Sequence, residues 1–252
     1  MSRIIAIVNQ KGGVGKTTTA MNLAAGLAVM EKKTLLIDLD PQGNSSSGLG
    51  INKNDIEKHI YQVIIGKVEI AETILPTSMD NLEIVPANIN LTGAEIELVK
   101  EFAREQKLKE ALKSITGNYE YIIIDCPPSL GLLSVNALTA CTDVIIPIQC
   151  EYFALEGVSQ LLNTIRLIQQ NLNPKLNVFG ILLTMYDKRL NLANQVVSEV
   201  KRYFKEQVFD TMINRNVKLC EAPSYGKSIF EYDIKSVGSQ NYLELASEVV
   251  NK

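Results

Sequence analysis

Apolar runs and amphipathic stretches alternate along this chain of 252 residues. Short continuous apolar runs predict buried strands, and apolar positions that recur at helical spacing predict helices. The predicted strands cover residues 3–9, 33–38, 82–86, 121–125, 144–148, 177–184 and 207–213. The predicted helices cover residues 16–30, 55–65, 91–115 (either continuous or broken near residue 101), 131–141, 154–171, 191–204 and 240–250.

The order of these elements predicts the fold class. Two apolar strands joined by a helix form a βαβ unit, which implies a parallel sheet covered on both faces with right-handed crossovers. We therefore expect an α/β fold with a mostly parallel twisted sheet of seven or eight strands, helices on both faces, and one domain over residues 1–252. The pattern is weaker over residues 45–100, where the run Ser45-Ser46-Ser47-Gly48 predicts the start of a polar loop.

A glycine-rich segment joins the first predicted strand to the first predicted helix. Glycines let a backbone turn its N–H groups inward, and the following helix N-terminus adds partial positive charge, so the segment predicts a phosphate site. Lys16 supplies an ammonium group for the β- and γ-phosphates, and the Thr17 hydroxyl is a typical ligand of the accompanying Mg²⁺. Gln10 stands where the strict P-loop pattern has its first glycine, and a second lysine, Lys11, follows it.

Carboxylates follow two of the predicted strands. Asp38 and Asp40 lie at the end of the second strand, and Asp125 ends the apolar run 121–125. Ligands of parallel sheets bind at the carboxyl ends of the strands. Asp38 and Asp125 are therefore predicted to orient the water shell of a Mg²⁺ held by Thr17. The alternative for Asp38 and Asp40 is a pair of loop carboxylates that merely cap a strand end.

Four segments resemble one known family. Residues 11–18 resemble the deviant Walker A motif of the ParA/MinD ATPases, and residues 38–44, 125–129 and 214–227 are similar to chromosomal ParA proteins of the Soj type. The last of these segments favours ParA over MinD. The resemblance implies a P-loop ATPase of the deviant Walker A type that hydrolyses ATP to ADP and phosphate.

The resemblance also implies roles for individual residues. Lys11 and Lys16 are expected to be catalytic, with Lys11 reaching the partner's phosphates across a nucleotide-sandwich homodimer. Asp40 is expected to position the attacking water, and Met185 with the 214–215 region to hold the base. The residues expected to bind nucleotide are Lys11, Gly12, Gly13, Val14, Gly15, Lys16, Thr17, Thr18, Met185, Asn214 and Arg215.

The function implied by the resemblance is an ATP-dependent DNA-partitioning switch. Mg²⁺ and ATP are its expected cofactors, and ATP binding is expected to drive dimerisation and binding to double-stranded DNA without sequence preference. A ParB-type DNA-binding partner is expected to stimulate an otherwise slow hydrolysis and so to segregate a chromosome or plasmid. Such a protein is expected in the cytoplasm, associated with the nucleoid and not with a membrane.

The charge pattern is compatible with a local DNA-binding face. The chain carries a formal charge of −3, yet residues 175–227 contain nine Lys and Arg against five Asp and Glu. Clustered cations contact phosphates without reading sequence. Arg189, Arg215 and Lys218 are the predicted DNA-binding residues. The alternative is a solvated surface on which the cations cluster by chance.

Two rival functions share the same loop. A MinD-like membrane-associated ATPase of division-site selection needs a basic amphipathic C-terminal helix, whereas residues 241–252 hold two glutamates and one lysine. An ATPase of the nitrogenase iron-protein type needs cysteines that ligate a cluster, and only Cys126 lies near the predicted nucleotide site. The four cysteines, Cys126, Cys141, Cys150 and Cys220, are predicted to be reduced, buried thiols.

Overall fold

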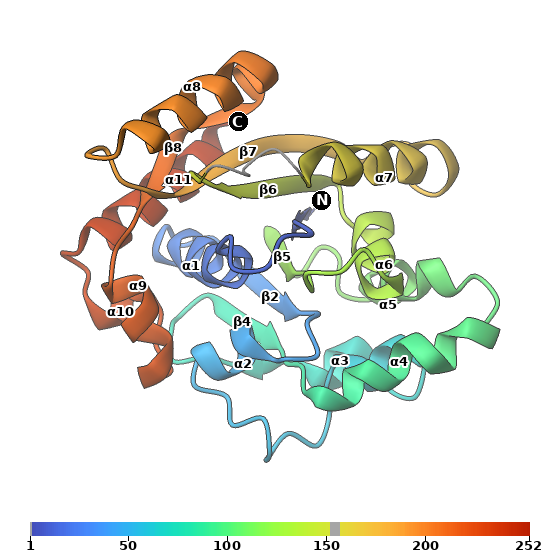
Figure 1. Cartoon of the computed structure of the whole chain (residues 1–252). Helices are drawn as coiled ribbons and strands as arrows, with labels where there is room; N and C mark the ends of the chain where they lie inside the picture. The colour runs from blue at the N-terminus through green and yellow to red at the C-terminus, as the bar shows by residue number, and fades with distance from the viewer. Residues whose placement is uncertain (1, 152–156) are drawn as a thin grey trace.

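The computed structural model describes residues 2–151 and 157–252, and an eight-stranded sheet forms their centre (Figure 1). The strand order is β3-β4-β2-β5-β1-β6-β7-β8, and every neighbouring pair is parallel except the antiparallel β3 and β4. The strands are β1 (Arg3–Ile7), β2 (Thr34–Asp38), β3 (Leu75–Pro76), β4 (Leu82–Val85), β5 (Tyr121–Asp125), β6 (Asp143–Gln149), β7 (Asn177–Tyr186) and β8 (Val208–Asn214). The predicted mostly parallel α/β sheet is confirmed.

Burial on both faces explains why the strands are continuously apolar. In β1, Ile4 and Ala6 pack into the core on one face of the sheet, while Ile5 and Ile7 pack into the core on the other. Successive strand residues point to opposite faces, so a strand covered on both sides requires an apolar residue at every position.

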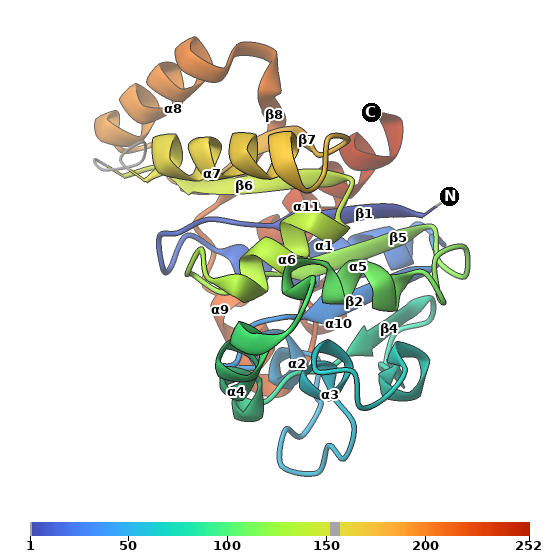
Figure 2. The same cartoon turned by 90° about the vertical axis from the view of Figure 1, so that its right-hand side faces the viewer.

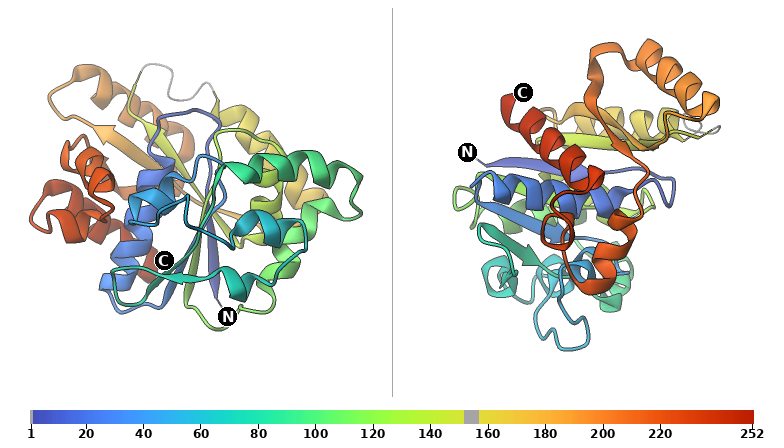
Figure 3. Two further views of the ribbon diagram at one scale, coloured as in Figure 1. Left: turned by 90° about the horizontal axis from the view of Figure 1, so that it is seen from below. Right: turned by 90° about the vertical axis from the view of Figure 1, so that its left-hand side faces the viewer.

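Helices cover both faces (Figures 1 and 2). One face is covered by α3 (Ile60–Ile64), α4 (Thr92–Glu97), α5 (Lys107–Leu112), α6 (Leu132–Ala140), α7 (Val158–Asn171) and α8 (Asn191–Phe204). The other is covered by α1 (Lys16–Val29), α9 (Lys218–Glu221), α10 (Ile229–Tyr232) and α11 (Val237–Asn251). In Figure 3, α11 runs across α1, and the hydroxyls of Thr19 and Tyr242 share a hydrogen bond of 3.2 Å between these helices.

The structure corrects the sequence-based prediction in several places. Of the two alternatives for residues 91–115, the broken stretch is the one observed, because Glu101 is extended and Ala103 has a left-handed φ of 50°. Helix α7 begins at Val158 in the described part of the chain, and residues 154–156 of its predicted helix lie outside that part. Cys220 is exposed, so the prediction of four buried thiols is wrong at that position.

The predicted polar loop at 45–48 is also wrong. These residues belong to a short helix, α2 (Asn44–Gly48), in which Ser45 and Ser46 are fully buried. Polar residues usually indicate exposure, but hydroxyls can be buried wherever hydrogen-bond partners receive them. Those partners are carboxylates at the ends of two strands.

Candidate functional site

The glycine-rich segment turns sharply into α1 at the carboxyl end of the sheet. Gly13 and Gly15 have left-handed φ values of 75° and 86°, which side chains with a Cβ rarely adopt. Gly15 directly precedes the first residue of α1, so the unpaired N–H groups of the helix start face the loop. This arrangement is suited to binding an anion.

Side chains from elsewhere hold this loop in place. Asn9 donates its Nδ2 hydrogen to the Pro147 carbonyl at 2.6 Å and accepts the Lys11 N–H at Oδ1 at 3.0 Å. On the other side, the Thr184 hydroxyl donates to the Val14 carbonyl at 2.9 Å. The loop is therefore tied to β6 and β7, which preorganises its backbone for binding.

A cleft of about 420 Å³ opens above the loop and brings many of the predicted site residues together. Its lining residues are Gly12, Gly13, Gly15, Lys16, Thr17, Thr18, Asp40, Gln42, Asn44, Pro128 and Met185. Lys11 is not among the residues that line this cleft in the described part of the chain.

Lys16 lies at the base of the cleft with 7% of its surface exposed. Its Nζ donates to the Lys11 carbonyl at 3.1 Å. Burial lowers the pKa of Lys16, and the charges of Asp125 and Asp40 oppose that shift. A buried ammonium with one carbonyl partner can still donate to anionic oxygens in the cleft.

Asp38 and Asp125 are register partners at the ends of the adjacent strands β2 and β5, and both are fully buried. Burial raises the pKa of Asp125, and the nearby charge of Asp38 raises it further. The Ser45 hydroxyl opposes this rise by donating to Asp125 Oδ2 at 2.8 Å. Asp125 Oδ1 is buried without a hydrogen-bond partner in the described part of the chain. A buried, unpartnered carboxylate oxygen beside a second carboxylate fits a hydrated divalent cation.

The protein does not provide a complete metal cage at this position. Within residues 2–151 and 157–252, no group of three or more His, Cys, Asp and Glu side chains could hold a metal ion. Mg²⁺ typically keeps several waters and binds through one or two carboxylates plus substrate phosphates. The Thr17 hydroxyl and the Asp125 carboxylate therefore fit a magnesium that arrives with a nucleotide.

Asp40 lines the cleft, and its own loop orients its carboxylate. Its Oδ1 accepts the Gln42 N–H at 2.9 Å, and only 7% of the residue is exposed. Gly43 closes the loop with a φ of 60°, where a Cβ would lie 2.6 Å from the Ala87 carbonyl oxygen. Glycine is therefore required at this turn.

A second cavity of about 200 Å³ lies beside the first. It brings together the three residues expected to hold the base, and Met185 adopts a strained left-handed φ of 51° there. Its lining residues are Gly15, Thr18, Thr184, Met185, Ile213, Asn214, Arg215, Asn216, Leu219, Cys220 and Tyr242. Ile213, Leu219 and Tyr242 were not predicted, because only folding brings their segments together.

Comparisons with known proteins agree with this geometry. A protein-family model described as an AAA domain matches residues 2–178. The sporulation initiation inhibitor protein Soj of Bacillus subtilis (strain 168) is 57% identical over 249 residues, which cover 99% of this chain and 98% of that protein. The chromosome partitioning protein ParA of Myxococcus xanthus (strain DK1622) is 56% identical over 252 residues, covering 100% and 89%. The chain belongs to the ParA/Soj family of partitioning ATPases.

Membership of the ParA/Soj family rests on these two relatives more than on any fold match. A solved structure of cobyrinic acid a,c-diamide synthase from Mycobacterium smegmatis, with bound ADP and magnesium, has a TM-score of 0.89. It is 38% identical and covers 100% of this chain and 95% of its own. The shared architecture confirms the P-loop α/β fold, whereas the higher identities belong to the partitioning proteins.

The three cations predicted to bind DNA in this ParA/Soj family member each have an acidic neighbour. Arg189 donates to Asp187 at 2.6 Å. Hydrogen bonds from Arg189 and, to a smaller extent, the charge of Arg215 lower the pKa of Asp187. Arg215 pairs with Glu151 at 3.4 Å, and Lys218 pairs with Glu221 at 3.0 Å. These side chains are 82%, 61% and 45% exposed, respectively, so solvent screens the pairs.

Helix α11 is the C-terminal helix that the MinD-like, membrane-associated alternative would require to bind a membrane. Its residues Tyr242, Leu245, Ala246 and Val249 are buried against the sheet and α1. The apolar face of α11 is thus part of the core. Among the described residues, no helix is long and apolar enough to cross a membrane.

Proposed function

We propose that this chain is an ATP-dependent DNA-partitioning switch built as one ATPase domain over residues 1–252. It binds Mg²⁺ and ATP, forms a nucleotide-sandwich homodimer, and binds double-stranded DNA without sequence preference. A ParB-type partner stimulates its hydrolysis of ATP to ADP and phosphate, and it works in the cytoplasm on the nucleoid. The observation that carries the proposal is the 420 Å³ cleft that joins the glycine loop, Lys16 and Asp40.

In this proposal, each residue of the cleft has a defined task. The N–H groups of the loop and the Lys16 ammonium hold the phosphates, while Thr17 and Asp125 hold the magnesium and its waters. Asp38 adds negative charge beside Asp125. Bound magnesium neutralises charge on the phosphate oxygens. The Asp40 carboxylate, held by Gln42 at the edge of the cleft, orients the attacking water.

The second cavity binds the base of the nucleotide. Its apolar walls and the Asn214 side chain suit a planar heterocycle with polar edges. Met185 lines both cavities and so lies between the proposed base and phosphate positions.

Lys11 is assigned to the partner subunit's nucleotide. The Lys11 carbonyl accepts a hydrogen bond from the Lys16 ammonium, which places the Lys11 backbone at the loop. Lys11 is partly exposed and is not among the residues that line the cleft of its own subunit in the described part of the chain. A cation supplied in trans stabilises the charge that develops on transferring phosphoryl groups, as an arginine finger does.

The proposed DNA face consists of Arg189 on the connection after β7, Arg215 on the connection after β8, and Lys218 at the start of α9. The backbone N–H of Arg215 donates to the Tyr186 carbonyl at 2.9 Å, so the two connections lie side by side. Their acidic partners are exposed or partly exposed, and phosphates can displace them because surface ion pairs are weak.

The test is an Asp40→Ala variant assayed with and without ATP. Since Asp40 acts on the attacking water, the variant should still bind ATP, accumulate as a dimer and retain DNA on a filter. Sedimentation velocity and filter binding measure the two properties, with Lys16→Ala as the control that loses both. If ATP promotes neither dimerisation nor DNA retention, the proposed function is wrong even if ATP binds.

A further inference from the structure

Three consecutive serines in α2 have three different hydrogen-bond partners. The Ser45 hydroxyl donates to Asp125 Oδ2 at 2.8 Å, and the Ser46 hydroxyl donates to Asp38 Oδ2 at 2.7 Å. The Ser47 hydroxyl instead donates to the Gly43 carbonyl at 3.1 Å, within its own turn. Only the first two reach the carboxylates of the site: Asp38 lies eight residues before Ser46, whereas Asp125 lies 80 residues after Ser45.

Asp38 accepts hydrogen bonds from both ends of the loop that carries Asp40. Its Oδ1 accepts the Asp40 N–H at 3.2 Å, and its Oδ2 accepts both the N–H and the hydroxyl of Ser46. The Ser46 hydroxyl also accepts the Ala87 N–H at 2.9 Å. Because Asp38 and Ser46 are fully buried, water cannot replace these bonds.

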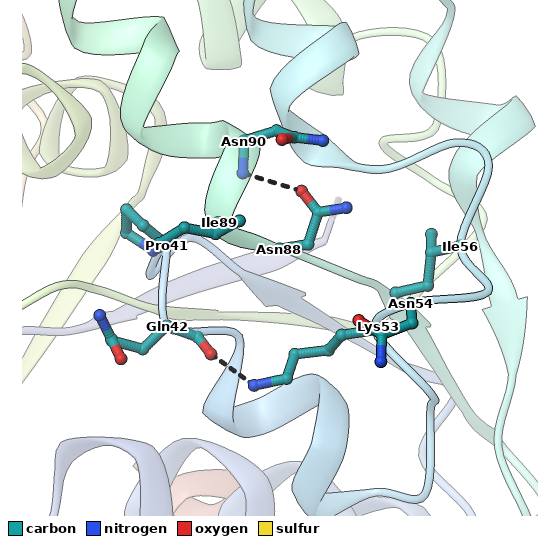
Figure 4. A pocket seen from close by; sticks show the side chains of 8 residues that line it. All are labelled: Pro41, Gln42, Lys53, Asn54, Ile56, Asn88, Ile89 and Asn90. Carbon is teal, nitrogen blue, oxygen red and sulfur yellow. Dashed lines mark hydrogen bonds between the residues drawn. The ribbon is translucent and has the colours of Figure 1, made fainter.

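The outer side of the same loop is held differently. Figure 4 shows Lys53 reaching the Gln42 carbonyl, at 2.7 Å, across a cavity of about 490 Å³ that Asn88 and Ile89 also line. Both residues of this bond are open to that cavity, so water can take the place of the lysine. The inner contacts through Ser46 are therefore the ones that restrict the loop.

We propose that Ser46 is a positioning residue for ATP hydrolysis: acting through Asp38, it fixes the loop that aims the Asp40 carboxylate. Ser45 has the parallel task of holding Asp125 through its Oδ2. Neither serine lines the cleft in the described part of the chain, so the proposed role of each runs through its carboxylate partner. The assignment of Ser46 rests on the proposed function, because it gives Asp40 its role in hydrolysis.

The experiment compares Ser46→Ala, Ser46→Thr and Ser47→Ala by steady-state ATPase kinetics in the full-length protein. Ser46→Ala should lower kcat about tenfold and leave KM for ATP within about twofold, because the phosphate loop is untouched. Ser46→Thr keeps the hydroxyl and should restore kcat. Ser47→Ala, the matched control, and Lys53→Met should each stay within about twofold of wild type.

Hydrogen exchange supplies a readout that does not depend on activity. The backbone amides of Asp40 and Gln42 should exchange about tenfold faster in Ser46→Ala than in Ser47→Ala, because the loop opens more often. Equal exchange and equal kcat in these two variants would overturn the assignment, as would a parallel loss of kcat and of ATP affinity. If the wild-type protein hydrolyses no ATP, the proposed function fails and the Ser46 assignment fails with it.

Discussion

Removal of two of the three cations assigned to the DNA face should weaken DNA binding through a measurable change in salt dependence. Arg189, Arg215 and Lys218 each contact an exposed or partly exposed carboxylate, so phosphates can displace those partners. An ATP-bound dimer would present six such cations, which corresponds to a slope of about −5 in log K against log salt concentration. Raising salt from about 50 to about 200 mM should then weaken binding about 10³-fold.

The assay is fluorescence anisotropy with a labelled duplex at several salt concentrations, in the presence of ATP and in the Asp40→Ala background. The variant Arg189→Ala/Lys218→Ala leaves Arg215, which lines the second cavity and thus the proposed base site, intact. It should reduce the magnitude of the slope by about 4, one for each of the two cations in each subunit of the dimer. Lys175→Ala/Arg166→Ala, on another part of the surface, is the control. A slope that is unchanged in the first variant would refute the assignment of this face to DNA.

Three other substitutions test single contacts. Glu248→Gln should lower the free energy of unfolding in urea by about 1 kcal/mol at neutral pH, because one of the N–H groups of Asp210 and Thr211 loses its carboxylate acceptor. Burial would raise the pKa of Glu248, but hydrogen bonds from Lys252 and these N–H groups lower it. The stabilisation is therefore present above pH 4.5 and is lost as pH falls. Equal stability of the variant and wild type at neutral pH would contradict this. Met185→Gly relieves the strain of a left-handed backbone but removes an apolar side chain from the second cavity, so calorimetry should find a stability within about 1 kcal/mol of wild type. ATP titration should find a severalfold weaker affinity, and an unchanged affinity would refute the place of Met185 at the base. Gly43→Ala should lower Tm by several degrees in thermal scanning because its Cβ meets the Ala87 carbonyl, and an unshifted Tm would show that the loop yields freely.

The parts of the site that are contiguous in sequence could be predicted from it. The glycine loop is local, so spacing alone indicates its conformation and the helix that follows. Asp38 and Asp125 could be placed together because parallel strands end at one edge of the sheet, and their register confirms that proximity. The strands were recognisable because burial on both faces leaves few polar positions.

The rest depends on contacts that only the folded chain makes. Ser45 and Ser46 have the composition of a loop, yet they are buried because their hydroxyls meet Asp125 and Asp38. Likewise, only the folded chain shows that Tyr242 lines the second cavity and that Arg215 has an acidic neighbour. Periodicity describes the environment of an element and does not identify the partner of a polar side chain.

The most direct test of the proposed dimer switch is a comparison of Lys11→Ala with Lys16→Ala by ATP titration and sedimentation velocity. If Lys11 acts on the partner's phosphates, Lys11→Ala should bind ATP with nearly the wild-type affinity and remain a monomer, whereas Lys16→Ala should lose ATP binding itself. Loss of ATP binding in Lys11→Ala, or an ATP-induced dimer of wild-type strength in that variant, would contradict the account.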